Sequence, residues 1–102
     1  MRIVTYKRIQ EFATKHPNTQ APLNVWYHTI TAKSWQNLTD IKHDFNSVDY
    51  VGNHRYVFNI KGNQYRLIAL IIFETRTLFI LFIGTHENYN KIEASKIEYK
   101  KL

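Results

Sequence analysis

The chain has 102 residues, a length that fits one domain with a modest hydrophobic core. Hydrophobic residues make up 44% and aromatic residues 15%, which indicates a packed globule and excludes a disordered chain. There is no cysteine, so disulfides and thiolate zinc sites are excluded. The net charge of +6 and the isoelectric point near 9.7 favour a polyanionic partner such as nucleic acid or the ribosome. A basic protein without such a partner is the alternative.

No segment has the pattern of a targeting or membrane sequence. The N-terminal residues MRIVTYKRIQ lack the apolar stretch of a signal peptide. The longest apolar run, Leu67–Phe73, has the length of a strand and is too short to cross a bilayer. We therefore expect a cytoplasmic protein with no membrane partner.

The first third of the chain predicts a short strand and two helices. Met1–Thr5 is a candidate strand, and Tyr6–His16 has apolar residues at the spacing of a buried helical stripe. Pro17 ends this helix, and Pro22 fits the first position of the next one. The apolar face of the second helix consists of Leu23, Trp26, Tyr27 and Ile30.

The rest of the chain predicts a short helix followed by a sheet. Asn37 is placed to cap a helix over Leu38–Phe45, and Val48–Val51 has the composition of a short edge strand. Three longer strands are predicted over Arg55–Ile60, Tyr65–Phe73 and Thr77–Gly84, joined by short turns. Strands connected in this way form an antiparallel meander.

The order of these elements indicates an α+β fold, because strands cluster after helices instead of alternating with them. We expect the two N-terminal helices to pack on one face of the sheet. The strand Tyr65–Phe73 is apolar on both sides, so the other face must be at least partly shielded. We interpret residues 1–102 as a single domain. Its basic C-terminal tail, residues 92–102, is expected to be mobile unless another element holds it.

Four residues suited to phosphodiester chemistry converge on one end of this predicted sheet. Arg66 begins the middle strand of the meander, and antiparallel pairing brings it toward His86 after the neighbouring strand. Lys61 lies in the hairpin turn at the same end, and Tyr89 follows His86. Arginine and lysine stabilise the charge of a phosphorane-like transition state. Histidine or tyrosine can exchange protons with an attacking 2′-hydroxyl and with the leaving oxygen.

Each of these residues also has an ordinary structural explanation. A lone histidine at a strand end is commonly solvated, a tyrosine commonly packs, and Arg66 has Glu74 and Glu87 as candidate partners for surface ion pairs. No metal or cofactor is predicted. His86-Glu87 opens like a zinc-protease helix, but Asn90 stands where the second histidine is required.

A family resemblance runs over nearly the whole chain. It rests on Val57-Phe58-Asn59-Ile60, Gly62-Asn63, Tyr65-Arg66-Leu67-Ile68 and the closing Gly84-Thr85-His86 with Tyr89. Upstream, the same order and spacing hold for Phe12, His16-Pro17, Pro22-Leu23, Trp26-Tyr27, Trp35 and Val51-Gly52-Asn53. With these features the chain resembles the HigB toxins of bacterial type II toxin–antitoxin systems, within the RelE-like superfamily.

The resemblance implies a RelE-like fold, with two N-terminal helices against a curved antiparallel sheet. It implies an mRNA interferase that cuts messenger RNA, typically in the ribosomal A site, without a metal or organic cofactor. The implied partners are mRNA, the ribosome and a cognate HigA-type antitoxin with a helix-turn-helix domain. Promoter DNA would be bound only through the toxin–antitoxin complex.

The resemblance also carries over to single positions. Arg66 falls on the family's Tyr-Arg-Leu position, His86 and Tyr89 fall on its Thr-His-x-x-Tyr segment, and Lys61 matches a turn position that is often basic. We expect these four residues to be catalytic. A second set of cations is expected to follow the RNA backbone, namely Arg55, Lys91, Lys96 and Lys100.

Two departures from the family pattern leave a rival open. Members usually read Ile-Arg where this chain has Ile80-Leu81, and Tyr-Asp where it has Tyr89-Asn90. A missing strand arginine removes a candidate phosphate contact, which costs about a few kcal/mol of transition-state stabilisation. The rival is a non-catalytic module that binds RNA, the ribosome or the antitoxin without cutting. A third reading, a basic scaffold with no RNA role, predicts RNA binding that is weak and depends little on salt.

Overall fold

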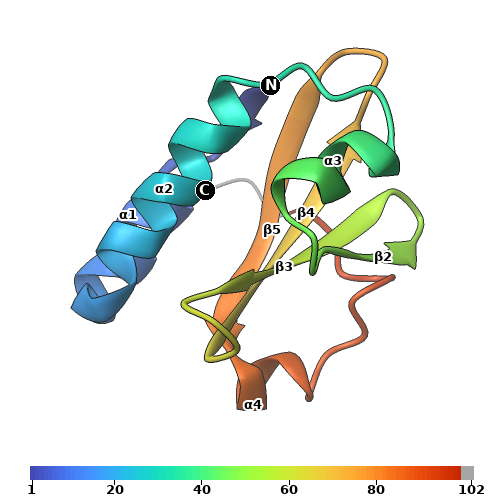
Figure 1. Ribbon diagram of the computed structural model, residues 1–102. Helices are drawn as coiled ribbons and strands as arrows, with labels where there is room; N and C mark the ends of the chain where they lie inside the picture. The colour runs from blue at the N-terminus through green and yellow to red at the C-terminus, as the bar shows by residue number, and fades with distance from the viewer. Residues whose placement is uncertain (100–102) are drawn as a thin grey trace.

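The computed structural model describes residues 1–99, which form one five-stranded sheet, with three helices between its first and second strands and a short helix after its last strand (Figure 1). The strands are β1 (Arg2–Val4), β2 (Asp49–Gly52), β3 (Arg55–Ile60), β4 (Tyr65–Ile72) and β5 (Thr77–Thr85). The helices are α1 (Lys7–Lys15), α2 (Gln20–Thr31), α3 (Leu38–Asp44) and α4 (His86–Tyr89), with a 3₁₀ turn, η1, at Pro17–Thr19. The predicted α+β class is confirmed.

The sheet has the strand order β1-β5-β4-β3-β2, and the meander from β2 to β5 is antiparallel as predicted. The first strand differs from the expectation of a wholly antiparallel sheet, because β1 pairs with β5 in the parallel direction, with Ile3 opposite Leu78. No hairpin joins these two strands. Three helices and three strands separate them in the chain, so their parallel pairing is a feature of the tertiary fold.

The main core lies between one face of the sheet, here called the inner face, and helices α1, α2 and α3. From β4 it takes Leu67 and Ile71, both fully buried, and from α2 it takes Trp26, which is 1% exposed. The Trp26 ring meets Phe58 of β3 edge to face, with 5.5 Å between ring centroids. The third helix adds Ile41 to this core, so three helices and not two cover the inner face.

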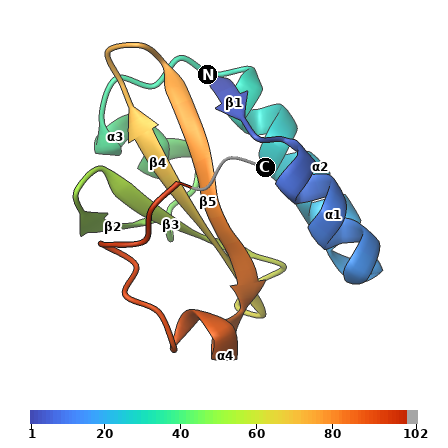
Figure 2. The same ribbon diagram turned by 180° about the vertical axis from the view of Figure 1, so that it is seen from behind.

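The opposite, outer face carries a second apolar cluster made of Val57, Ile68 and Leu81. Its cover is the chain after α4, which runs on across the sheet (Figure 2) and packs through Ile92, Ala94, Ile97 and Tyr99. The sequence predicts that the second face of the strand β4 is at least partly shielded from solvent. Residues 92–99, the described part of the tail, provide this cover.

One of two local expectations is shifted, and the other is confirmed. Helix α1 ends before Pro17 as predicted, but η1 leads directly into α2, so that Pro22 is the third residue of α2 and not the first. Asn37 caps α3 as predicted, since its side-chain oxygen accepts a hydrogen bond from the Asp40 N–H at 3.0 Å. Within residues 1–99, no helix is long and apolar enough to cross a membrane.

Candidate active site

The end of the sheet where β4 begins and β5 finishes is tied together by backbone contacts. Tyr65 pairs with Thr85 and Arg66 with Gly84. The backbone N–H of His86 donates to the Gln64 carbonyl at 3.2 Å, which joins the β3–β4 turn to the start of α4. The antiparallel register therefore places the predicted catalytic residues Arg66 and His86 on adjoining segments.

The Arg66 side chain extends from the outer face and is half-buried. Its guanidinium lies over the Tyr89 ring, with 5.8 Å from Cζ to the ring centroid, and Nη1 donates to the Asn63 carbonyl at 3.1 Å. None of the ion pairs found within residues 1–99 joins Arg66 to Glu74 or Glu87. The cation is thus positioned by an aromatic ring and by the turn.

His86 is exposed and stands at the first position of α4. Its Nδ1 lies 3.2 Å from the side-chain amide nitrogen of Asn90. With the amide in this orientation Asn90 donates to Nδ1, and a neutral imidazole then carries its proton on Nε2. The Thr85 hydroxyl caps α4 by accepting from the Asn88 N–H at 3.1 Å. The sequence reasoning overlooked this cap, although threonine before a short helix is its usual signal.

The remaining predicted cations differ in their surroundings. Lys61 is exposed in the β3–β4 turn at this end of the sheet, with a backbone φ of +53°. Lys91 lies 4.0 Å from Glu87, and Lys96 lies 3.5 Å from Glu93, both as exposed pairs of the kind that contribute little to stability. Lys100 lies outside the described residues.

Arg55 stands at the other end of β3 and does not join the catalytic group. Its Nε and Nη2 donate to the Ile97 carbonyl at 3.2 and 2.8 Å. Beside it, the Asn53 amide donates to the Ser95 carbonyl at 2.9 Å. In the structure Arg55 holds the tail, and its contact with RNA stays a prediction.

Comparison with known proteins places this chain in a family. A profile described as "HigB_toxin, RelE-like toxic component of a toxin-antitoxin system" matches residues 19–92. The "mRNA interferase toxin HigB" of Escherichia coli K12 is 31% identical over 97 residues, covering 92% of each chain. The "mRNA interferase HigB" of Escherichia coli O6:H1 (strain CFT073) is 29% identical over 103 residues, covering 99% of this chain and 100% of that protein.

The chain belongs to the HigB toxin family. The resemblance seen in its sequence is thereby confirmed, and so is the RelE-like α+β fold. The matched residues 19–92 include Lys61, Arg66, His86 and Tyr89. Membership makes the chain the toxic component of a toxin–antitoxin system, which implies an antitoxin partner.

Leu81, the position at which the sequence resemblance leads us to expect an arginine, is buried in the structure. Leu81 is only 4% exposed and packs with Val57 and Ile68 in the outer cluster. It lies in a bulge, because Ile68 pairs with Phe82 while the next residue, Ala69, pairs with Ile80. Leu81 therefore has a structural place in this chain, as part of the apolar surface that the tail covers.

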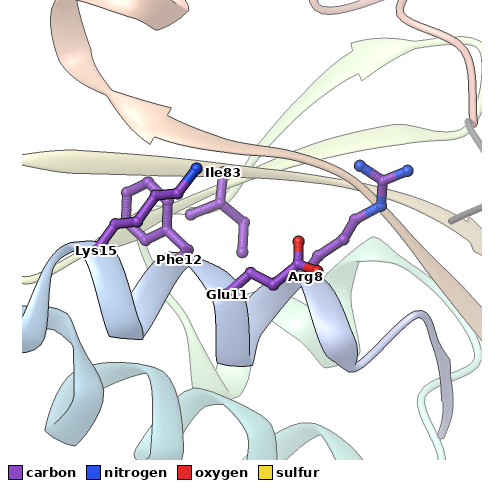
Figure 3. A pocket seen from close by; sticks show the side chains of 5 residues that line it. All are labelled: Arg8, Glu11, Phe12, Lys15 and Ile83. Atoms are coloured by element: carbon purple, nitrogen blue, oxygen red, sulfur yellow. The ribbon is translucent and has the colours of Figure 1, made fainter.

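The structure also contains a cavity of about 160 Å³ between α1 and β5, shown in Figure 3. It is lined by Arg8, Glu11, Phe12, Lys15 and Ile83. Phe12 and Ile83 pack against the inner core, so the cavity opens on the side of the sheet opposite Arg66. It contains none of the predicted catalytic residues, and we place the candidate site at the sheet end instead.

Proposed function

We propose that this chain is an mRNA interferase, an endoribonuclease that cuts translated mRNA on the ribosome in the cytoplasm. The observation that supports it most strongly is the Arg66 guanidinium 5.8 Å from the centre of the Tyr89 ring, at the sheet end where α4 begins with His86. The relatives named above are called mRNA interferases, and the net charge of +6 suits a polyanionic substrate.

In the proposed reaction the 2′-hydroxyl of the nucleotide attacks its own 3′-phosphate. The new bond joins O2′ to phosphorus and the bond to the 5′-oxygen of the next nucleotide breaks, leaving a 2′,3′-cyclic phosphate and a 5′-hydroxyl. Arg66 and Lys61 stabilise the negative charge that develops on the phosphoryl oxygens. No metal is required in this scheme, because the two cations supply the positive charge.

Two proton transfers accompany this step, one from the 2′-hydroxyl and one to the leaving oxygen. His86 and Tyr89 are the candidates, and either can serve as acid or as base. The contact between Asn90 and Nδ1 of His86 leaves Nε2 as the imidazole nitrogen available for exchange. Exposure of His86 lets this nitrogen reach a bound substrate without rearrangement of the core.

The partner of this toxin is proposed to be a HigA-type antitoxin with a helix-turn-helix domain. The toxin would reach promoter DNA only through the complex with this antitoxin. Arg55, Lys91, Lys96 and Lys100 are proposed to follow the RNA backbone.

The test is mapping of mRNA 5′ ends after brief induced expression of the wild type and of Arg66→Ala and His86→Ala. We expect new ends inside translated frames with the wild type and their loss in both variants. Arg76→Ala and His43→Ala serve as matched controls, because both residues are exposed and lie outside the proposed site. Equal cutting by all variants would rule out this site.

The rival function is a module that binds RNA, the ribosome or the antitoxin without cutting. It is favoured by Leu81, which is buried where the family usually places arginine, and by Asn90 in place of the usual aspartate. It predicts no new 5′ ends from folded wild-type protein. The same mapping experiment therefore separates the two functions.

A further inference from the structure

The ring of Phe82 lies beside the candidate site, in a space that is open because residue 84 is a glycine. Gly84 lies opposite Arg66 in the pairing of β4 with β5. A Cβ atom at Gly84 would lie 2.4 Å from Cζ of Phe82 and 3.1 Å from each of its Cε atoms. The tip of the Phe82 ring therefore occupies the space that a side chain at position 84 would fill, next to the strand position of Arg66.

The bulge in β5 is what brings Phe82 to this face. Ile80 packs into the inner core, and strict alternation would return Phe82 to the same side. Because the bulge adds Leu81 as an extra residue, both Leu81 and Phe82 lie on the outer face, and Ile83 returns to the inner one. Phe82 thus shares a face with Tyr89, over whose ring the Arg66 guanidinium lies.

Phe82 is half-buried, so it remains partly open to solvent. The central members of the outer cluster, Val57, Ile68 and Leu81, are at most 4% exposed, whereas Leu70 and Phe79 on the same face are half-buried like Phe82. An aromatic ring that is partly open to solvent beside a cation has the composition of a single-stranded RNA subsite, where bases stack on rings and phosphates meet cations.

We propose that Phe82 is a base-stacking residue that receives the nucleobase adjoining the phosphate held by Arg66. The ligand class is single-stranded RNA, and Gly84 takes part by keeping the space for the ring. This inference rests on the proposed function for the role of Arg66, but the stacking itself requires binding only and no cleavage.

The experiment uses the full chain and a short RNA oligonucleotide with 2′-O-methyl groups throughout, which prevents attack by the 2′-oxygen. One base is 2-aminopurine, whose fluorescence falls when it stacks on a ring, and anisotropy of an end label measures affinity separately. We expect the wild type to bind and quench. Phe82→Leu should lose the quenching and bind about 5- to 150-fold more weakly, the range expected for loss of one base–aromatic stack.

Two further variants make the test specific. Gly84→Ala keeps the phenylalanine but displaces its ring, so it should reproduce the loss, and the double variant should be no worse than Phe82→Leu alone. Phe79→Leu is the matched control, because Phe79 lies on the same strand and face but packs on Tyr99, at 5.2 Å between centroids. It should bind and quench as the wild type does. If Phe82→Leu does not fold, Gly84→Ala carries the test.

Quenching that persists in Phe82→Leu or Gly84→Ala overturns the inference, as does a wild type that binds without quenching or does not bind. Additive losses in the double variant also overturn it, because they show that the two residues act separately. Failure of the proposed function gives a different result. If the protein makes no new mRNA ends in cells but still quenches 2-aminopurine in a way that depends on Phe82, stacking is supported and cleavage is refuted.

Discussion

Replacing Leu81 with arginine tests whether the outer face can accept the strand cation that the sequence resemblance leads us to expect at this position. Leu81 is 4% exposed and is enclosed by Val57, Ile68 and the tail. Removing its burial costs about 2 to 3 kcal/mol. The guanidinium must then either remain beneath the tail, where an unpaired cation is costly, or displace residues 92–99 into water.

We therefore expect Leu81→Arg to lower the free energy of unfolding by about 3 to 5 kcal/mol, out of the roughly 5 to 15 kcal/mol typical of a domain. With a urea slope of about 1 to 3 kcal/mol per molar, the midpoint should fall by about 2 M. Val25→Arg is the matched control, because it adds the same charge at a position of α2 that is 65% exposed. Its free energy of unfolding should stay within about 0.5 kcal/mol of the wild-type value.

A Leu81→Arg protein with the wild-type midpoint would refute this reasoning, since it would show that the tail moves aside at little cost. If that protein also cut mRNA much more strongly than the wild type, the chain would be a decayed enzyme in which the leucine replaced a catalytic contact. Val25→Arg must leave cutting unchanged for that conclusion, because it controls for the general effect of added charge on RNA binding.

Two further predictions concern the contacts that hold peripheral segments. The Trp35 indole N–H donates to Asp44 at 2.8 Å and, with Lys33 at 3.4 Å, lowers the pKa of that carboxyl. Such a group stabilises the fold above its unfolded pKa of about 3.9 and loses this effect as the pH falls through the folded value. Between about pH 5 and about pH 2, the urea midpoint of Asp44→Asn should therefore fall less than that of the wild type. An equal fall in the two proteins would show that Asp44 does not contribute to the acid sensitivity of the fold. Arg55→Leu should expose residues 92–99 to protease, whereas a fall of about 0.7 in the salt slope of RNA affinity would instead show that Arg55 contacts a phosphate.

The elements of this protein are encoded locally, and the sequence predicts them well. The alternating and turn-forming residues around Lys61–Gln64 give β3 the bounds Arg55–Ile60 that the structure has, and β4 differs by one residue. The helix α3 follows from its Asn37 cap. Each of these signals depends on residues within a few positions, which is why a single sequence suffices to interpret them.

The proximity of the candidate site residues was also predictable from local sequence. Arg66 and the segment from Thr85 to Tyr89 belong to consecutive antiparallel strands, so a hairpin register brings them together without any long-range information. The chemical roles of these residues rest on the family resemblance and stay a prediction. The position of Phe82 on the outer face was not predictable. Strand residues are assigned to the two faces by strict alternation, and the bulge in β5 interrupts this alternation.

The sequence by itself determined the α+β class, the meander, the family and the group of residues at one end of the sheet. Only the tertiary structure decided that β1 runs parallel to β5, that the tail covers the outer face, and that Arg55 holds this tail. The physical reason is sequence distance. Arg55 and Ile97 are separated by 42 positions, and no local preference specifies a contact that arises only when both segments pack on the same sheet.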